Sequence, residues 1–195
     1  MRTQDQSRLT AALAFALEHH GSQTRKGKPV PYVAHLMQVA GLVLEYGGGV
    51  DEAVAGLLHD VLEDCEGVTE ASLRELFGPA VARIVVACTD TLEGDTPDDK
   101  SPWKERKLSY LARLREADAS CRLVSACDKL HNLRDMLADI RWEGVGTLDR
   151  FNTTAQELQW YFDGIREATA GGLPKQLENE LEAQVAEFRR QVAGA

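Results

Sequence analysis

The sequence predicts an all-α domain of about eight or nine helices. Three observations support this: apolar residues recur at helical spacing along most of the chain, residues that start or stop helices separate these runs, and no segment has the alternation typical of a strand. With 195 residues and 44% hydrophobic content, the chain is long enough for one domain with a sizeable core.

Helix-start residues and glycine or proline stops delimit five helical segments in the first half of the chain. These predicted segments are residues 3–21, 31–47, 51–64, 69–78 and 80–91. Their expected starting residues are Thr3 with Gln6 in a capping box, Pro31, Asp51 and Thr69. A basic loop separates the first two segments, and it contains Arg25, Lys26 and Lys28.

The second half begins with the clearest predicted loop, residues 92–101, which is rich in Gly, Asp and Pro. Ser101 with Pro102 is expected to start the next helix, and Asp118 and Thr147 to start the two after it. The pair Gly171-Gly172 breaks the last of these.

A final amphipathic helix follows, and we expect residues 1–170 to form the main domain and residues 171–195 this helix. Its apolar stripe consists of Leu177, Leu181, Val185, Phe188 and Val192. The stripe is expected to pack on the domain or on a partner, so a homodimer is possible.

The composition excludes several classes of function. A net charge of −9 argues against a nucleic-acid or acidic-membrane partner. No apolar run is long enough for a transmembrane helix, and no secretory signal is visible at the N-terminus. The four cysteines have no metal-binding spacing and are expected to be reduced thiols of a cytoplasmic protein.

The most informative local feature is His59-Asp60 followed by Glu63-Asp64. In a helix, these four polar residues lie together opposite the apolar face. Such a polar face is most often simply solvated, so the quartet alone favours that interpretation. A divalent metal is the alternative, because one imidazole and three carboxylates gathered at one place need a cation among them.

Two further segments offer ligands of the same kind, namely His35 in the second predicted helix and Asp128 in the helix that Asp118 starts. Two imidazoles with two carboxylates, from His35, His59, Asp60 and Asp128, suit Mn²⁺, Fe²⁺, Co²⁺ or Zn²⁺. They do not suit Ca²⁺, which prefers oxygen ligands.

In this order, these four residues form the H…HD…D pattern of the HD-superfamily metal-dependent phosphohydrolases. Six motifs together resemble the hydrolase domain of RelA/SpoT homologues over about residues 8–165, and the chain length is similar to that of the small alarmone hydrolases. The motifs are Gln23-Thr24-Arg25-Lys26, Pro31-Tyr32-Val33-Ala34-His35, Leu57-Leu58-His59-Asp60-Val61-Leu62-Glu63-Asp64, Phe77-Gly78, Thr89-Asp90 and Asp128-Lys129-Leu130-His131-Asn132-Leu133-Arg134-Asp135.

The resemblance implies a helical HD-domain bundle and a role for each matching residue. The implied metal ligands, by similarity to Mn²⁺ sites, are His35, His59, Asp60 and Asp128. Glu63 and Asp64 are implied to position and activate the attacking water. The implied contacts to the nucleotide and its phosphates are Arg25, Lys26, Asn132, Lys104 and Lys107.

The resemblance also implies the reaction, which is hydrolysis of the 3′-pyrophosphate of guanosine tetra- or pentaphosphate, (p)ppGpp, to GDP or GTP and pyrophosphate. No synthetase domain is expected, so the protein would degrade alarmone and not make it. Two alternatives remain open: a related phosphohydrolase for 3′-pyrophosphorylated adenosine or the 2′-phosphate of NADPH, and a non-catalytic nucleotide-sensing module.

The remaining histidines are interpreted structurally. His19 and His20 end the first predicted helix, where a positive charge favours the helix dipole. His131 is expected to pack or to contact the base and not to bind metal. The chain from Gly144 onward is the region least typical of the family, so its role stays open.

Overall fold

The computed structural model describes residues 2–91, 94–95 and 99–193. In these ranges all regular structure is helical, apart from one isolated β-bridge between Thr24 and Pro31, so the predicted all-α fold is confirmed. The elements are α1 Thr3–His20, α2 Val33–Glu45, α3 Val50–Leu58, α4 Val61–Asp64, α5 Glu70–Phe77, α6 Pro79–Cys88, α7 Trp103–Glu116, α8 Ala119–Glu143, the 3₁₀ helix η1 Val145–Arg150, α9 Ala155–Thr169 and α10 Lys175–Ala193. The loop predicted at residues 92–101 falls partly outside the described residues.

The helix predicted at residues 51–64 is divided into α3 and α4 at His59-Asp60. In an uninterrupted helix, the carbonyl of Gly56 would accept from the backbone N–H of Asp60. Here the Nδ1 atom of His59 lies 2.9 Å from that carbonyl oxygen instead. The side chain therefore takes the place of a helix hydrogen bond, and the break places His59 and Asp60 at a helix junction.

The helix start predicted at Thr147 is wrong. Residues 145–150 form the 3₁₀ helix η1, and α9 begins only after Thr154. The Thr154 hydroxyl accepts from the backbone N–H of Glu157 at 3.2 Å, and the Glu157 carboxylate accepts from the backbone N–H of Thr154 at 3.1 Å. This reciprocal capping box fixes the helix start and leaves Phe151 in a loop.

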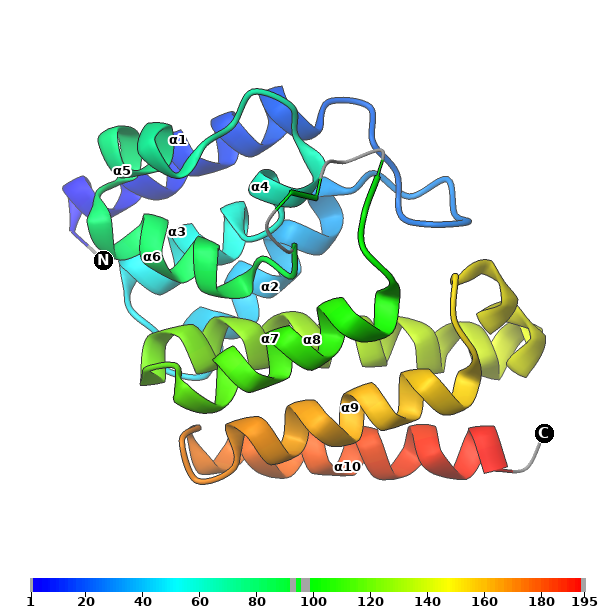
Figure 1. The fold of residues 1–195 in the computed structure, drawn as a ribbon. Coiled ribbons are helices and arrows are strands. Elements are labelled where there is room, and N and C mark those ends of the chain that lie inside the picture. The colour runs from blue at the N-terminus through cyan, green and yellow to red at the C-terminus, as the bar shows by residue number, and fades with distance from the viewer. Residues whose placement is uncertain (1, 92–93, 96–98, 194–195) are drawn as a thin grey trace.

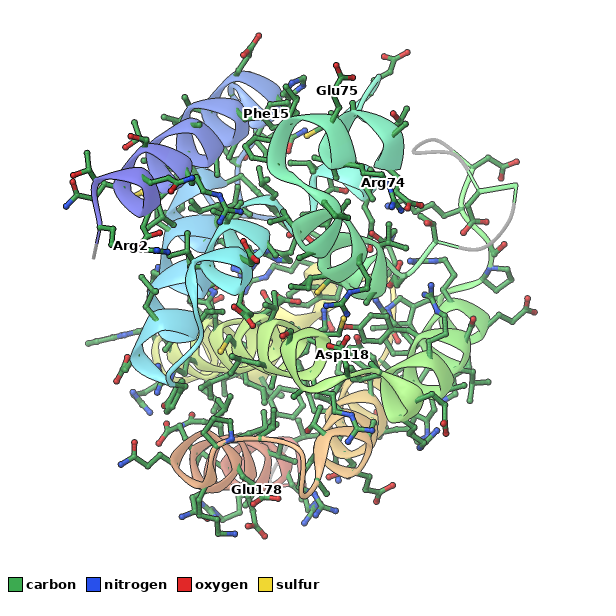
Figure 2. All side chains as sticks on the ribbon, turned by 90° about the vertical axis from the view of Figure 1, so that its left-hand side faces the viewer. Arg2, Phe15, Arg74, Glu75, Asp118 and Glu178 are labelled. Atoms are coloured by element: carbon green, nitrogen blue, oxygen red, sulfur yellow. The ribbon has the colours of Figure 1, made fainter. Side chains whose placement is uncertain are left out.

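Helix α8 is the centre of the fold. It is 25 residues long and packs against α2, α3 and α6 on the N-terminal side and against α9 and α10 on the other (Figure 1). Its N-terminus is capped by Asp118, whose side chain accepts from the backbone N–H of Cys121 at 3.0 Å (Figure 2). Because α8 contacts both groups of helices, a side chain in the middle of α8 can contact residues from either group.

The N-terminal half is closed by aromatic packing between α1 and α5. Phe15 points from α1 toward α5, where its ring meets that of Phe77 edge-on at 5.3 Å (Figure 2). Helix α1 also packs against α3, which holds the helix that leads into His59. No helix among the described residues is long and apolar enough to cross a membrane.

Helix α10 lies beside α9 and packs on α8 and α9 (Figure 1). The five residues of its apolar stripe are all buried, and the ring of Phe188 meets that of Phe162 at 5.5 Å. The stripe is thus covered within this chain. The domain boundary near residue 170 and the possible homodimer stay predictions.

Candidate active site

Three of the four residues predicted to bind a metal, His35, His59 and Asp128, have donor atoms within 4.8 Å of one another, and Asp60 lies beside the two histidines. His35 comes from α2, His59 and Asp60 from the α3–α4 junction, and Asp128 from the middle of α8. The His35 Nε2 atom lies 3.2 Å from the His59 Nε2 atom and 3.3 Å from the Asp128 Oδ1 atom. Asp60 Oδ2 lies 3.0 Å from His59 Nε2 and 3.6 Å from His35 Nε2. Ligand atoms about 2.1 Å from a shared ion lie about 3.0–3.4 Å apart. The distances among His35, His59 and Asp128, which are 3.2, 3.3 and 3.5 Å, are close to this spacing, so these three residues could hold one divalent cation.

Hydrogen bonds orient both imidazoles with their Nε2 atoms toward this point. A carbonyl oxygen only accepts, so the 2.9 Å contact to Gly56 requires a proton on His59 Nδ1. The Nδ1 atom of His35 lies 2.7 Å from the Nδ1 atom of His131. His131 thus lies directly behind a predicted ligand. The bond of His59 to a backbone carbonyl is the arrangement typical of metal-binding histidines.

The carboxylates of the cluster are held in the ionised state. Although burial opposes the charge, Lys129 and His59 hold the pKa of Asp128 well below its usual range. The pKa of Asp60 is likewise lowered against burial, chiefly by His59. Burial disfavours the charged form of His59, yet the negative charges of Asp60 and Asp128 raise its pKa well above the usual value. The cluster therefore attracts positive charge strongly.

Glu63 and Asp64 lie beside the cluster. Together with Asp60 and Asp128 they line a cavity with a volume of about 510 Å³. Burial, with help from the charges of Asp90 and Asp60, raises the pKa of Glu63 to about 7. Burial and the charge of Asp60 also raise the pKa of Asp64. The Lys100 Nζ atom lies 3.8 Å from a carboxylate oxygen of each acid.

Most of the predicted substrate contacts line this cavity, namely Arg25, Lys26, Asn132 and Lys107. The Asn132 amide links two sides of the site, because its Oδ1 accepts from Arg25 at 2.6 Å and its Nδ2 donates to Asp128 Oδ1 at 2.6 Å. Lys104 is not among the lining residues. Its Nζ atom lies 3.1 Å from the centre of the Trp160 ring instead.

Several lining residues were not predicted as site residues, and the clearest are Tyr32, Lys129, Arg150 and Phe151. Tyr32 and Lys129 belong to motifs that also contain predicted site residues, and this proximity in the sequence could have identified them as site residues. The helix predicted from Thr147 includes Phe151, whereas in the structure Phe151 follows η1 in a loop and lines the cavity. A second cavity of about 480 Å³ shares four lining residues with the first, namely Lys26, Trp103, Phe151 and Leu158.

The chain is similar to known proteins over nearly its whole length. It matches the HD domain family over residues 12–149. The guanosine-3′,5′-bis(diphosphate) 3′-pyrophosphohydrolase MESH1 of Danio rerio is 32% identical over 89% of this chain and 90% of its own. MESH1 of Xenopus tropicalis is 33% identical over 91% of this chain and 93% of its own.

A solved structure, described as a metazoan orthologue of SpoT that hydrolyses ppGpp, covers 95% of both chains at 24% identity with a TM-score of 0.72. This likeness supports the helical fold. The sequence matches show that the protein belongs to the HD domain family, in the group that contains the MESH1 proteins.

Proposed function

We propose that this protein is a metal-dependent enzyme that hydrolyses the 3′-pyrophosphate of (p)ppGpp to GDP or GTP and pyrophosphate. The observation that carries the proposal is one cavity lined by Asp60, Asp128, Glu63, Asp64 and a set of cationic side chains, with the buried imidazoles of His35 and His59 in contact with the two aspartates. Relatives that match about nine-tenths of the chain are named as enzymes of this activity.

The donor set supports a divalent cation held by His35, His59, Asp60 and Asp128. Their donor atoms converge from three parts of the fold, and the protein supplies two negative charges to neutralise the ion. Mixed imidazole and carboxylate ligands suit Mn²⁺, which we propose as the ion. When bound, such an ion lowers the pKa of a coordinated water and polarises a phosphoryl oxygen.

Glu63 is proposed as the group that accepts the proton of the attacking water. Its pKa near 7 allows it to accept a proton at neutral pH and to release it again. Asp64 is proposed to orient the same water, because it lines the same cavity one residue further along. Lys100, 3.8 Å from both carboxylates, balances part of their charge.

Substrate phosphates are proposed to contact Arg25, Lys26 and Lys107, with Asn132 holding the Arg25 guanidinium in place. The local cations are needed because a chain of net charge −9 otherwise repels a polyphosphate. A guanidinium can bind a phosphate with two parallel hydrogen bonds. Lys104 remains proposed as a more distant contact, reached from its position on Trp160.

The test is a turnover assay with guanosine tetraphosphate and Mn²⁺ that resolves pyrophosphate from orthophosphate. We expect pyrophosphate as the product, and we expect Asp60→Ala and Glu63→Gln each to reduce kcat by at least about 100-fold. Intact activity in Asp60→Ala would refute the proposed site. Orthophosphate from NADPH, with no turnover of guanosine tetraphosphate, would instead establish the alternative substrate. The cytoplasmic location stays a prediction.

A further inference from the structure

His20, the last residue of α1, is buried next to the candidate active site. Its side chain is 2% exposed, whereas the neighbouring His19 is partly exposed, with its ring centre 4.1 Å from that of Phe15. A role limited to the helix dipole does not require burial, because such an effect operates at the surface. The contacts of His20 therefore point to an additional role.

The first contact of His20 leads to Asp64 through Gln23. The Gln23 Nε2 atom donates to the backbone carbonyl of Asp64 at 2.9 Å, which fixes the amide with Oε1 toward His20. That Oε1 atom lies 2.8 Å from His20 Nδ1, so Nδ1 carries the proton and donates it. The hydrogen bonds thus run in one direction from His20 to the backbone of Asp64.

The second contact of His20 leads to Asp60 through Tyr32. The His20 and Tyr32 rings are stacked, with centres 5.0 Å apart and planes inclined by 17°. The Tyr32 hydroxyl donates to Asp60 Oδ2 at 2.6 Å. That oxygen also lies 3.0 Å from His59 Nε2, so Tyr32 bonds the oxygen that faces the metal cluster.

We propose that His20 is a positioning residue that fixes Asp60 and Asp64 at the same time. Its ring face holds Tyr32 against Asp60, and its Nδ1–H holds Gln23 against the backbone of Asp64. The Nε2 atom of His20 is buried with no hydrogen-bond partner among the described residues, so the bond to Gln23 is the polar contact that orients the ring. One side chain of α1 thereby supports a metal ligand and a proposed water-orienting acid.

The two connections can be separated with two substitutions. In His20→Asn, the side-chain amide nitrogen replaces Nδ1 and can still donate to Gln23, but the ring is lost. In His20→Phe, a ring remains to stack on Tyr32, but the donor is lost. His19→Asn and His19→Phe are matched controls at the adjacent position, which lies outside the site.

The experiment measures Mn²⁺ affinity by calorimetry without substrate, and kcat and KM for guanosine tetraphosphate. Loss of a residue behind a ligand typically weakens metal binding or activity by about 10- to 100-fold. We expect His20→Asn to weaken Mn²⁺ binding by about 10-fold or more. We expect His20→Phe to bind Mn²⁺ normally but to lose about 10-fold in kcat with KM unchanged. Both His19 variants should behave as the unaltered protein.

A double-substitution cycle tests the connection through Tyr32. If His20 acts on Asp60 through Tyr32, the losses of Mn²⁺ affinity in His20→Asn and Tyr32→Phe should not add when the two are combined. Fully additive losses would overturn this connection. Equal losses of affinity and kcat in both His20 variants, accompanied by a lower Tm, would overturn the positioning role in favour of general packing.

The expected loss of kcat in His20→Phe rests on the proposed function, whereas the expected loss of Mn²⁺ affinity in His20→Asn does not. If the unaltered protein binds Mn²⁺ but does not hydrolyse guanosine tetraphosphate, the proposed function fails and the affinity measurements still decide whether His20 positions Asp60. Unchanged affinity in His20→Asn, in a protein that does turn over the nucleotide, would overturn the inference alone.

Discussion

The carboxylate of Glu63 accepts a hydrogen bond of 2.6 Å from the backbone N–H of Asp90. The side chain of Asp90 in turn binds Arg106 and Lys107 of α7. Glu63 is therefore connected through one residue to the helix that supplies cations to the cavity. Asp90 affects the pKa of Glu63 in two opposite ways. The charge of the Asp90 side chain raises this pKa, and the hydrogen bond from the Asp90 backbone N–H lowers it.

The first prediction concerns the pH dependence of turnover. Glu63 accepts a proton only when it is ionised, and burial together with Asp90 places its pKa at about 7. We expect kcat to fall as pH decreases through about 7, and to be nearly constant above about pH 8. The measurement is kcat against pH at saturating substrate and Mn²⁺.

The control for this prediction is Glu63→Gln, which cannot be ionised. Its residual activity should lack the decrease around pH 7. A decrease with the same midpoint in this variant would assign it to another group and contradict the role proposed for Glu63.

The second prediction concerns Asp90→Asn. This substitution removes a negative charge that raises the pKa of Glu63, so the acidic limb of the kcat profile should move to lower pH. Arg106 and Lys107 lose their carboxylate partner, and we expect a stability loss of up to about 3 kcal/mol, since both cations keep some access to solvent. Urea unfolding and the pH profile measure the two effects.

Glu105 is an exposed residue of α7, the helix that carries Arg106 and Lys107, and it provides the control for Asp90→Asn. Glu105→Gln should change neither the stability nor the midpoint of the profile. If Asp90→Asn moved the midpoint to higher pH, the electrostatic account of Glu63 would be wrong.

The sequence predicted that His35, His59, Asp60 and Asp128 lie close together, because these residues belong to short motifs whose order along the chain is distinctive. It did not predict the division of the helix at His59-Asp60. Glu63 and Asp64 were expected on the same helical face as His59, yet the actual geometry depends on a bond from the His59 side chain to the backbone of Gly56. Helical periodicity contains no information about such a bond.

The residues that sequence reasoning missed depend on tertiary contacts. The helix start predicted at Thr147 lies seven residues too early, because the capping box that starts α9 is formed by Thr154 and Glu157. Phe151 thereby reaches the cavity from a loop. From the sequence, His20 is only a residue at a helix end. Its burial against Tyr32 depends on how α1 meets the following loop, which the sequence pattern does not show.

The third prediction concerns metal removal. The proposed ligands come from α2, from α8 and from the junction between α3 and α4, so a bound ion connects segments far apart in the chain. An ion present at 100 times its Kd stabilises the folded state by about 2.7 kcal/mol. For a chain of this length that corresponds to about 5–10 °C in Tm. We expect chelation to lower Tm by this amount and Mn²⁺ to restore it.

Asp60→Ala separates a specific metal effect from a general effect of the chelator. Its Tm should not respond to Mn²⁺, because one of the four ligands is missing. An unchanged Tm after complete chelation of the unaltered protein would show that the site is not coupled to folding.

The last prediction concerns α10, whose stripe is buried against α8 and α9 of the same chain. The Phe188 side chain is 1% exposed and its ring contacts Phe162, so Phe188→Ala leaves a cavity in the core. We expect a stability loss of about 3–5 kcal/mol in urea unfolding, and no loss for the exposed control Glu182→Ala. Truncation after Gly172 should expose the core and yield an unfolded or aggregated protein. A truncated protein that stays folded and changes only from dimer to monomer would show that α10 serves assembly instead.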